Sequence, residues 1–246
     1  MINPMTLDGK HILITGGSSG IGRECAIRSS NLGAHVTIIA RNAENLKETI
    51  QLMSNPKCHT WYEFDLNETE EIETLINRIV KEQGSVDGFC HAAGISPVRT
   101  LKMLNNKFLE KMFRIHEYAF VEIIRSLSMK KNLNDGASLI GISSVAARRG
   151  SFAHGAYSAA KASMEGILAS LAMELSSRRI RINAVSFGMV DTNMYQDFLN
   201  YGDENSLEKQ YLGVIDLESA ANMITFLLSD ACKYITASTI PVWAGV

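Results

Sequence analysis

Short apolar runs rich in β-branched residues alternate along the chain with longer segments whose apolar residues recur at the helical period. Strands are predicted at residues 11–15, 36–40, 60–64, 88–91, 138–142, 181–186 and 238–242. Helices are predicted from residue 20 and at residues 43–53, 68–83, 105–129, 156–176 and 217–228. Such alternation is typical of a parallel sheet with crossover helices. The pattern therefore predicts a doubly wound α/β fold of about seven strands with helices on both faces.

One segment interrupts this alternation. Residues 189–213 are polar, carry Asn, Asp and Gly, and follow neither the strand nor the helix period. No linker, repeat or low-complexity stretch is present, so we expect residues 1–246 to form a single domain in which 189–213 is an irregular substrate lid. Pro241 lies in the last predicted strand and has no N–H to donate, which predicts that this strand is an edge strand.

Two of the predicted helices are too apolar for burial of a single face. Residues 108–129 carry many large aliphatic and aromatic side chains, and residues 156–172 are rich in Ala and Ser. Apolar surface beyond one stripe indicates a subunit interface, and deep burial within one chain is the alternative. We therefore expect a homo-oligomer, either a dimer or a tetramer.

The composition excludes several classes of protein. The chain has 24 Lys+Arg and 26 Asp+Glu, and this near-neutral balance argues against nucleic-acid binding. No apolar run reaches the ~18 residues of a membrane span, and the N-terminus lacks signal-peptide features, so a cytoplasmic protein is expected. The four cysteines are far apart and form no CxxC pair, which indicates free thiols, with neither a metal site nor a disulfide framework.

The first predicted strand leads directly into a glycine-rich turn, Thr15-Gly-Gly-Ser-Ser-Gly-Ile-Gly22, which opens the first predicted helix. Glycines let the backbone approach a pyrophosphate closely, and free N–H groups at a helix N-terminus bind its charge. The spacing is G-x-x-x-G-x-G rather than G-x-G-x-x-G. Its position between a strand and a helix nevertheless favours dinucleotide binding over an ordinary surface loop.

The residue after the second predicted strand bears on the choice of cofactor. An acidic residue at this point usually binds the ribose hydroxyls, but here Arg41 follows Ala40. A guanidinium pairs well with phosphate, so the sequence favours NADP(H) over NAD(H). Asp65, at the end of the third strand, is a candidate acceptor for the adenine amine or, alternatively, a helix cap.

A candidate catalytic group comes from two predicted elements. Tyr157 and Lys161 are four residues apart on a predicted helix and share one face, and Ser144 follows the fifth predicted strand. Ligands of doubly wound sheets bind at the carboxyl ends of the strands, so the three side chains are expected to converge beside the cofactor. The pairing of Tyr with Lys alone would be weak evidence.

These motifs, taken in order, resemble the short-chain dehydrogenase/reductase family from about Gly9 to the C-terminus. The matching residues are Thr15-Gly16-x-x-x-Gly20-Ile21-Gly22, Asp65-Leu66, Ala92-Ala93-Gly94, Ser144, Tyr157-x-x-x-Lys161, Ile182-Asn183-Ala184-Val185 and Thr192. The likeness is closest to the branch that contains the 3-oxoacyl-acyl-carrier-protein reductases, through residues 142–146 and 229–236. The resemblance implies a Rossmann-type fold and hydride transfer between a nicotinamide and a carbonyl carbon.

The resemblance also implies a role for each matching residue. Tyr157 would be the acid in reduction and the base in oxidation, although a free phenol has a pKa of about 10. Lys161 would favour the phenolate by its charge and hold the nicotinamide ribose, and Ser144 would donate a hydrogen bond to the substrate oxygen. The implied cofactor-binding set is Gly16, Ser18, Ser19, Gly20, Ile21, Gly22, Arg41, Asp65, Leu66, Ala92, Ala93, Gly94, Tyr157, Lys161, Gly188, Val190 and Thr192.

The chain departs from the family pattern at four positions. His91 replaces the first Asn of Asn-Asn-Ala-Gly, with little expected effect. His116 stands where the family has a fourth catalytic residue, an Asn that helps to hold a water on a proton path to the lysine. It could act in a relay, with a titration near neutrality, or be purely structural. The large side chains Phe187 and Trp243 replace the Pro of Pro-Gly and the Asp of Asp-Gly-Gly, and they could reshape either the cofactor site or an interface.

The leading expectation is an NADP(H)-dependent oxidoreductase that interconverts a carbonyl and a secondary alcohol, possibly on a 3-oxoacyl thioester. The alternatives are a sugar, polyol or small-ketone dehydrogenase of the same family and a cofactor-binding scaffold without turnover. A carrier-protein substrate would need a basic patch near the mouth of the site, for which Arg148 and Arg149 are the candidates.

Overall fold

The computed structural model describes residues 3–129, 131–199 and 210–245, and its strands form a parallel sheet of seven strands. The strands are β1 (His11–Thr15), β2 (His35–Ala40), β3 (Thr60–Glu63), β4 (Val86–His91), β5 (Leu133–Ser144), β6 (Arg181–Phe187) and β7 (Ser238–Val242). Their order across the sheet is β3-β2-β1-β4-β5-β6-β7. The strand order reverses between β1 and β4, which is the switch point of a doubly wound sheet. The predicted fold class is confirmed.

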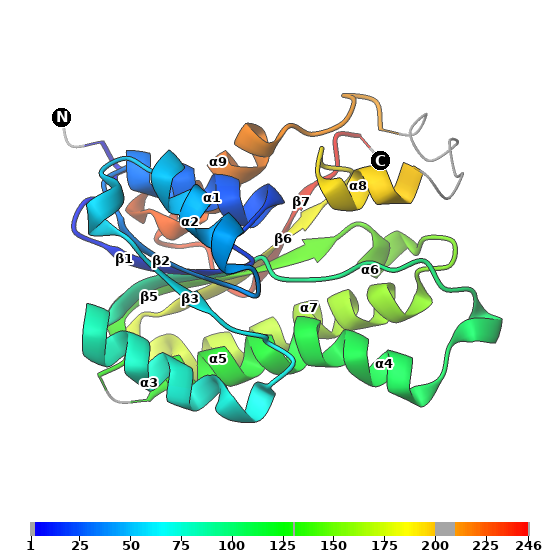
Figure 1. Cartoon of the computed structure of the whole chain (residues 1–246), viewed down its shortest axis with the longest axis horizontal. Helices are drawn as coiled ribbons and strands as arrows, with labels where there is room; N and C mark the ends of the chain where they lie inside the picture. Colours follow the sequence, from blue (N-terminus) through cyan, green and yellow to red (C-terminus); the bar gives the residue numbers. More distant parts are fainter. Residues whose placement is uncertain (1–2, 130, 200–209, 246) are drawn as a thin grey trace.

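Helices cover both faces of this sheet (Figure 1). The α-helices are α1 (Gly20–Asn31), α2 (Ala43–Leu52), α3 (Ile72–Gln83), α4 (Asn106–Phe113), α5 (Ala119–Ser128), α6 (Ala146–Arg149), α7 (Gly155–Leu175), α8 (Asn193–Leu199) and α9 (Leu217–Leu228). Short 3-10 helices are η1 (Pro56–Cys58), η2 (Thr69–Glu71), η3 (Leu101–Met103), η5 (Ser176–Arg178) and η7 (Asp230–Cys232). Figure 1 places α1, α2 and α9 on one face and α3, α5 and α7 on the other.

The hydrophobic core lies in two layers, one on each face of the sheet. All five residues of β1 are buried, because a central parallel strand is covered by helices on both sides. Within β1, Leu13 faces the layer of α3, α5 and α7, whereas Ile12 and Ile14 face the layer of α1, α2 and α9. This alternation of side chains explains why the strands are continuously apolar in sequence.

The edge position predicted for the last strand is confirmed. β7 pairs only with β6, and Pro241 stands opposite Ser186 in the register. No further strand in the described part of the chain needs an N–H at position 241, so proline disrupts no hydrogen bond there.

Three predicted segments differ in detail from the structure. The helix expected at 105–129 consists of α4, a π-helical turn η4 (Arg114–Tyr118) and α5. β5 is longer than expected, and α6 follows it directly. The irregular segment 189–213 contains α8, and its residues 200–209 lie outside the described part of the chain.

Two further sequence expectations can be compared with the structure. No helix in the described part of the chain has both the length and the hydropathy that crossing a membrane requires. The cysteines Cys25, Cys90 and Cys232 are buried free thiols, and Cys58 is an exposed one.

Candidate active site

A cavity of about 510 Å³ opens at the carboxyl ends of the strands, the end toward which β5 and β6 point in Figure 1. Its walls come from the glycine-rich turn and from the loops that follow β2, β3, β4, β5 and β6. All predicted site residues line it, namely Gly16, Ser18, Ser19, Gly20, Ile21, Gly22, Arg41, Asp65, Leu66, Ala92, Ala93, Gly94, His116, Ser144, Tyr157, Lys161, Gly188, Val190 and Thr192. Residues from widely separated positions are thus brought to one place, as the sequence predicted.

The glycine-rich turn leaves the N-terminus of α1 open toward this cavity. Ser19 is the N-cap residue, but its side chain makes no capping hydrogen bond, so the first N–H groups of α1 lack this partner. Glycine is required at Gly16, which has φ +72° and whose Cβ would lie 2.7 Å from the Ala93 nitrogen. A Cβ on Gly22 would lie 2.3 Å from the Gly16 oxygen. An uncapped helix end beneath so tight a turn fits the pyrophosphate of a dinucleotide.

One residue that supports this turn was missed in the sequence. The Arg23 guanidinium donates hydrogen bonds to the Ser18 carbonyl oxygen at 2.7 and 3.1 Å and pairs with Glu48 at 2.9 Å. Arg23 therefore stabilises the glycine-rich turn through the Ser18 carbonyl oxygen. Nothing in the local sequence distinguishes it from a solvated arginine on a helix.

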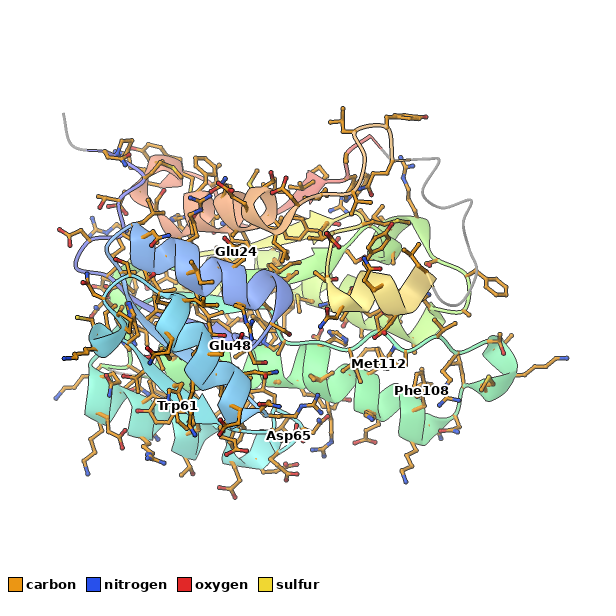
Figure 2. The ribbon with its side chains drawn as sticks, turned by 45° about the horizontal axis from the view of Figure 1, so that its top comes forward. Glu24, Glu48, Trp61, Asp65, Phe108 and Met112 are labelled. Atoms are coloured by element: carbon orange, nitrogen blue, oxygen red, sulfur yellow. The ribbon has the colours of Figure 1, made fainter. Side chains whose placement is uncertain are left out.

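Arg41 and Asp65 lie at the other end of the cavity, beyond β2 and β3. Arg41 is exposed, and it is the one arginine among the described residues that line the cavity. The Asp65 Oδ1 atom accepts hydrogen bonds from the backbone N–H and side-chain amide of Asn67 at 3.0 and 2.7 Å. Figure 2 labels Asp65 in the loop after β3. The carboxylate thus stabilises its own loop while it faces the cavity.

Ser144, Tyr157 and Lys161 meet at the end of β5 and the start of α7. The Ser144 Oγ accepts a hydrogen bond from the Ala146 N–H at 3.2 Å, which fixes the side chain at the strand exit. The Lys161 Nζ is buried, donates to the Ile142 carbonyl oxygen at 2.6 Å and lies 5.7 Å from the centre of the Tyr157 ring. The residues that the sequence predicted to converge do so.

Burial governs the titration of this group. It raises the pKa of Tyr157, and a hydrogen bond from Ser144 only partly opposes the increase. Burial also lowers the pKa of Lys161 to about 7, so the ammonium loses much of its charge near neutrality. That Lys161 favours the phenolate by its charge stays a prediction, because burial and Ser144 account for the shift in the Tyr157 pKa.

His116 lies edge-on to Tyr157, with ring centres 5.4 Å apart. Its Nε2 atom lies 2.8 Å from the Ile95 carbonyl oxygen and 3.3 Å from the Ile95 backbone nitrogen, so the tautomer decides whether it donates to the carbonyl or accepts from the N–H. Its Nδ1 atom is buried and forms no hydrogen bond with any residue that the structure describes. Burial, reinforced by the charge of Lys161, lowers the pKa of His116 well below its usual value. The expectation that His116 titrates near neutrality is therefore wrong, and the residue is a neutral imidazole whose Nδ1 has no partner among the described residues.

His91 connects the sheet to the π-helical turn. Its Nε2 donates to the Ile115 carbonyl oxygen at 3.0 Å, so its Nδ1 is the acceptor for the Thr15 hydroxyl at 2.9 Å. Burial, with a smaller effect of the Lys161 charge, lowers the pKa of His91 to about 3. The π-helical turn carries both Ile115 and His116, so His91 helps to place His116. Its contribution is larger than the sequence suggested.

The two remaining departures from the family pattern, Phe187 and Trp243, contact other residues of the same chain. Phe187 ends β6, is buried in the α1/α2/α9 layer and lines the cavity. The Trp243 Nε1 donates to the Ser186 Oγ at 3.0 Å. The Arg149 guanidinium stacks over the Trp243 ring at 5.4 Å, and Arg148 pairs with Glu165 at 2.9 Å. Both arginines of the expected basic patch are thus engaged within the chain.

The cavity is also lined by residues that no sequence motif predicted. Beside the catalytic group they include Ser96, Ser151, His154, Met189, Met194 and Tyr195. The His154 ring lies edge-on to Tyr157, with centres 6.0 Å apart. Below them, a small buried cluster of Met112, Ala156 and Ala160 supports Tyr157, and Figure 2 shows Met112 one turn from Phe108 on α4. Loop residues such as these follow no period, so only the fold reveals them.

Comparison with known proteins agrees with this geometry. A family profile described as "Enoyl-(Acyl carrier protein) reductase" matches residues 16–246. The chain belongs to the short-chain dehydrogenase/reductase family. Members of this family are oxidoreductases that bind a nicotinamide cofactor, and the open N-terminus of α1 fits such a group.

Two curated short-chain dehydrogenase/reductase relatives match nearly the whole chain. A 3-oxoacyl-[acyl-carrier-protein] reductase of Rickettsia felis is 32% identical over 241 residues, which cover 98% of each chain. An L-xylulose reductase of Caenorhabditis elegans is 28% identical over 246 residues, which cover 96% of this chain and 95% of the relative. One of these relatives is thus named for a 3-oxoacyl-[acyl-carrier-protein] substrate and the other for a sugar.

Solved structures of the family superpose closely. A dehydrogenase/reductase from Sinorhizobium meliloti has a TM-score of 0.91 and 28% identity and covers 98% of this chain and 96% of its own. A blue fluorescent protein from a metagenomic library, solved in complex with NADPH, has a TM-score of 0.88 and 25% identity and covers 98% of both chains.

Proposed function

We propose that this protein is an NADP(H)-dependent reductase that converts a carbonyl into a secondary alcohol. One observation carries the proposal: Ser144, Tyr157 and Lys161 converge in the same cavity as the open N-terminus of α1. A cofactor whose pyrophosphate lay at this helix end would extend along the cavity toward the three side chains. The bound nicotinamide supplies the hydride.

The side chains of the protein supply the remaining chemistry. Ser144 donates a hydrogen bond to the substrate oxygen, on which negative charge develops. Tyr157 gives its phenolic proton to that oxygen. Lys161 donates to the Ile142 carbonyl oxygen, which places its Nζ near the Tyr157 ring, where it would hold the nicotinamide ribose. His116 offers its unpartnered Nδ1, as donor or acceptor according to its tautomer, to a proton path that resupplies Tyr157.

The electrostatics favour the reductive direction. A proton donor must be protonated before it reacts, and burial raises the pKa of Tyr157, which keeps the phenol protonated at neutral pH. Alcohol oxidation would instead need the phenolate. At neutral pH Tyr157 is therefore in the protonated form that carbonyl reduction requires.

The choice of NADP(H) rests on Arg41. Its guanidinium is exposed at the end of the cavity that would receive the adenosine ribose, and no carboxylate follows β2. An arginine at this point attracts a 2′-phosphate and offers no acceptor for a free 2′-hydroxyl. Asp65 remains as the candidate partner of the adenine.

Two substrate classes are proposed, in order. A 3-oxoacyl thioester comes first because the relative from Rickettsia felis is named for this activity. A small ketone or ketose comes second, and the relative named L-xylulose reductase supports it. Arg148 is paired with Glu165, which leaves the exposed Arg149, stacked on Trp243, as the one arginine of the two without a carboxylate partner in the described part of the chain, so the expected basic patch is small. A free thioester is therefore the more informative first substrate.

We also propose that the enzyme is a homo-oligomer. Ala159, Ala162, Gly166 and Ala169 are exposed along one side of α7, together with Met173, which is 77% exposed. Small side chains on an apolar helix allow close approach of a second helix, as expected of a subunit contact.

The test is NADPH oxidation with three carbonyl substrates: an acetoacetyl thioester, a ketose and a small ketone. At least one is expected to be reduced, and Tyr157→Phe is expected to lower the rate at least ~100-fold, since it removes the proton donor. Tyr62→Phe is the matched control, because the Tyr62 hydroxyl bonds Glu82 of α3 and Tyr62 does not line the cavity. NADPH binding without turnover of any carbonyl would favour a cofactor-binding scaffold instead.

A further inference from the structure

The amide of Gln210 is a buried polar group outside the catalytic set. The residue is 4% exposed. Its Oε1 accepts a hydrogen bond from the Met189 N–H at 2.8 Å, and its Nε2 donates to the carbonyl oxygens of Met189 at 3.0 Å and Gly213 at 2.6 Å. One side chain thus holds both backbone groups of Met189. Because both the oxygen and the nitrogen of this buried amide are hydrogen-bonded to backbone groups, the amide fixes the positions of these groups relative to one another.

The segment held in this way is the cavity wall that continues β6. Ser144 is opposite Phe187 in the sheet, and the Val145 N–H donates to the Phe187 carbonyl oxygen at 2.8 Å. Gly188, Met189 and Val190 follow at once and line the cavity. The wall therefore begins beside the catalytic group and lies at the opposite end of the cavity from Arg41. In the proposed function it faces the nicotinamide half of the cofactor.

Gln210 and Ile215 hold this wall from behind. The Ile215 N–H donates to the Met189 carbonyl oxygen, and the Asp191 N–H donates to the Ile215 carbonyl oxygen, both at 2.9 Å. The Met189 N–H, in contrast, has Gln210 as its partner. A Cβ on Gly188 would lie 2.6 Å from the Gln210 Oε1, so the absence of a side chain at 188 lets the amide approach. Without the amide, the wall would keep its backbone hydrogen bonds to Ile215 and Val242, but the Met189 N–H would lose its acceptor.

We propose that Gln210 is a positioning residue that sets the shape of the Gly188–Val190 wall for the nicotinamide half of the cofactor. The inference rests on the proposed function and extends it to a residue outside the family motifs found in the sequence. The Gln210 amide bonds the backbone of Met189 and Gly213, and of these two only Met189 lines the cavity, so its effect on a ligand passes through Met189. Its loss should weaken binding of the whole cofactor while leaving the adenosine half unaffected.

The experiment compares two ligands by titration calorimetry. NADPH spans the cavity, whereas 2′,5′-ADP fills only the adenosine end beside Arg41. Gln210→Leu removes the amide at similar volume, and it is expected to weaken NADPH binding about tenfold, since a buried N–H then loses its acceptor. Binding of 2′,5′-ADP is expected to change less than about twofold.

Two further variants make the comparison specific. Gln83→Leu is the matched control, because it removes one amide hydrogen bond, to Thr60, at the edge of the sheet away from the cavity. It should change neither affinity. Gln210→Glu keeps the acceptor for the Met189 N–H, but its second oxygen faces the carbonyl oxygens of Met189 and Gly213. It should therefore recover part of the NADPH affinity only at a pH low enough to protonate it, when its O–H can donate to one of them.

The outcomes separate this inference from the proposed function. Equal weakening of both ligands in Gln210→Leu would indicate a general structural defect and overturn the positioning role, as would unchanged NADPH binding. Normal 2′,5′-ADP binding shows that a variant is folded. If the unsubstituted protein failed to bind NADPH at all, the proposed function itself would fail, whatever Gln210 does.

Discussion

Titration of the buried His91 is expected to lower the free energy of unfolding at acid pH, and a single substitution can separate this effect from other titrations. His91 joins the Thr15 hydroxyl to the Ile115 carbonyl oxygen and is fully buried. Asn offers one acceptor and one donor at a similar separation, so His91→Asn can keep both kinds of hydrogen bond without a group that titrates in this range. The pair of proteins therefore differs chiefly in one titration.

The size of the effect follows from the pKa of His91. Burial lowers it from 6.5 to about 3 in the folded protein, so the folded state holds the neutral form and the unfolded state binds a proton first. Stability is then fully present above pH 6.5 and is lost as the pH falls toward 3. Because one pKa unit is worth about 1.4 kcal/mol, His91 should remove roughly 3 kcal/mol between pH 7 and pH 4.

The assay is urea unfolding followed by circular dichroism across this pH range. The free energy of unfolding of the natural protein should fall more steeply than that of His91→Asn, with a difference of about 3 kcal/mol in the change from pH 7 to pH 4. Comparing slopes removes any constant effect of the substitution. Parallel pH dependences for the two proteins would refute the reasoning, because they would mean that His91 titrates alike in both states.

Two further predictions concern the cavity. Arg41→Ala should weaken NADPH binding about tenfold in calorimetry and leave NADH binding nearly unchanged, because the guanidinium meets only the 2′-phosphate; equal losses for both cofactors would contradict this role. His116→Ala should lower kcat several-fold and His116→Asn should retain it, since Asn restores an acceptor. The natural protein and His116→Asn should share one pH profile between about pH 6 and 9, because the pKa of His116 lies well below this range. Equal kcat in all three proteins would exclude a relay through His116.

The sequence predicted the elements that local rules control. β1 begins and ends at the predicted residues His11 and Thr15, because a buried strand followed by a glycine turn has an unambiguous pattern. Ser144, Tyr157 and Lys161 could be found because a strand exit and a helix face fix their positions. Pro241 indicated the edge strand through its missing N–H alone.

The remaining features depend on contacts between distant segments. The π-helical turn at Arg114–Tyr118 has an ordinary helical sequence. Its Ile115 carbonyl oxygen accepts a hydrogen bond from His91, which is far away in the chain. The pKa of His116 depends on the depth of its burial, which no single position reveals. Gln210 reads as a loop residue until the fold places its amide against Met189. Sequence patterns identify side chains that must be present, but not the environment that sets their charge.

Transfer of deuterium tests the central claim most directly. The protein is mixed with NADPH carrying deuterium at the hydride-donating carbon and with the best carbonyl substrate, and the alcohol is examined by mass spectrometry. We predict one deuterium on the carbinol carbon with the natural protein and with Tyr62→Phe, and no detectable product with Tyr157→Phe. An unlabelled alcohol, or equal labelled product from Tyr157→Phe, would contradict reduction by hydride transfer with Tyr157 as the proton donor.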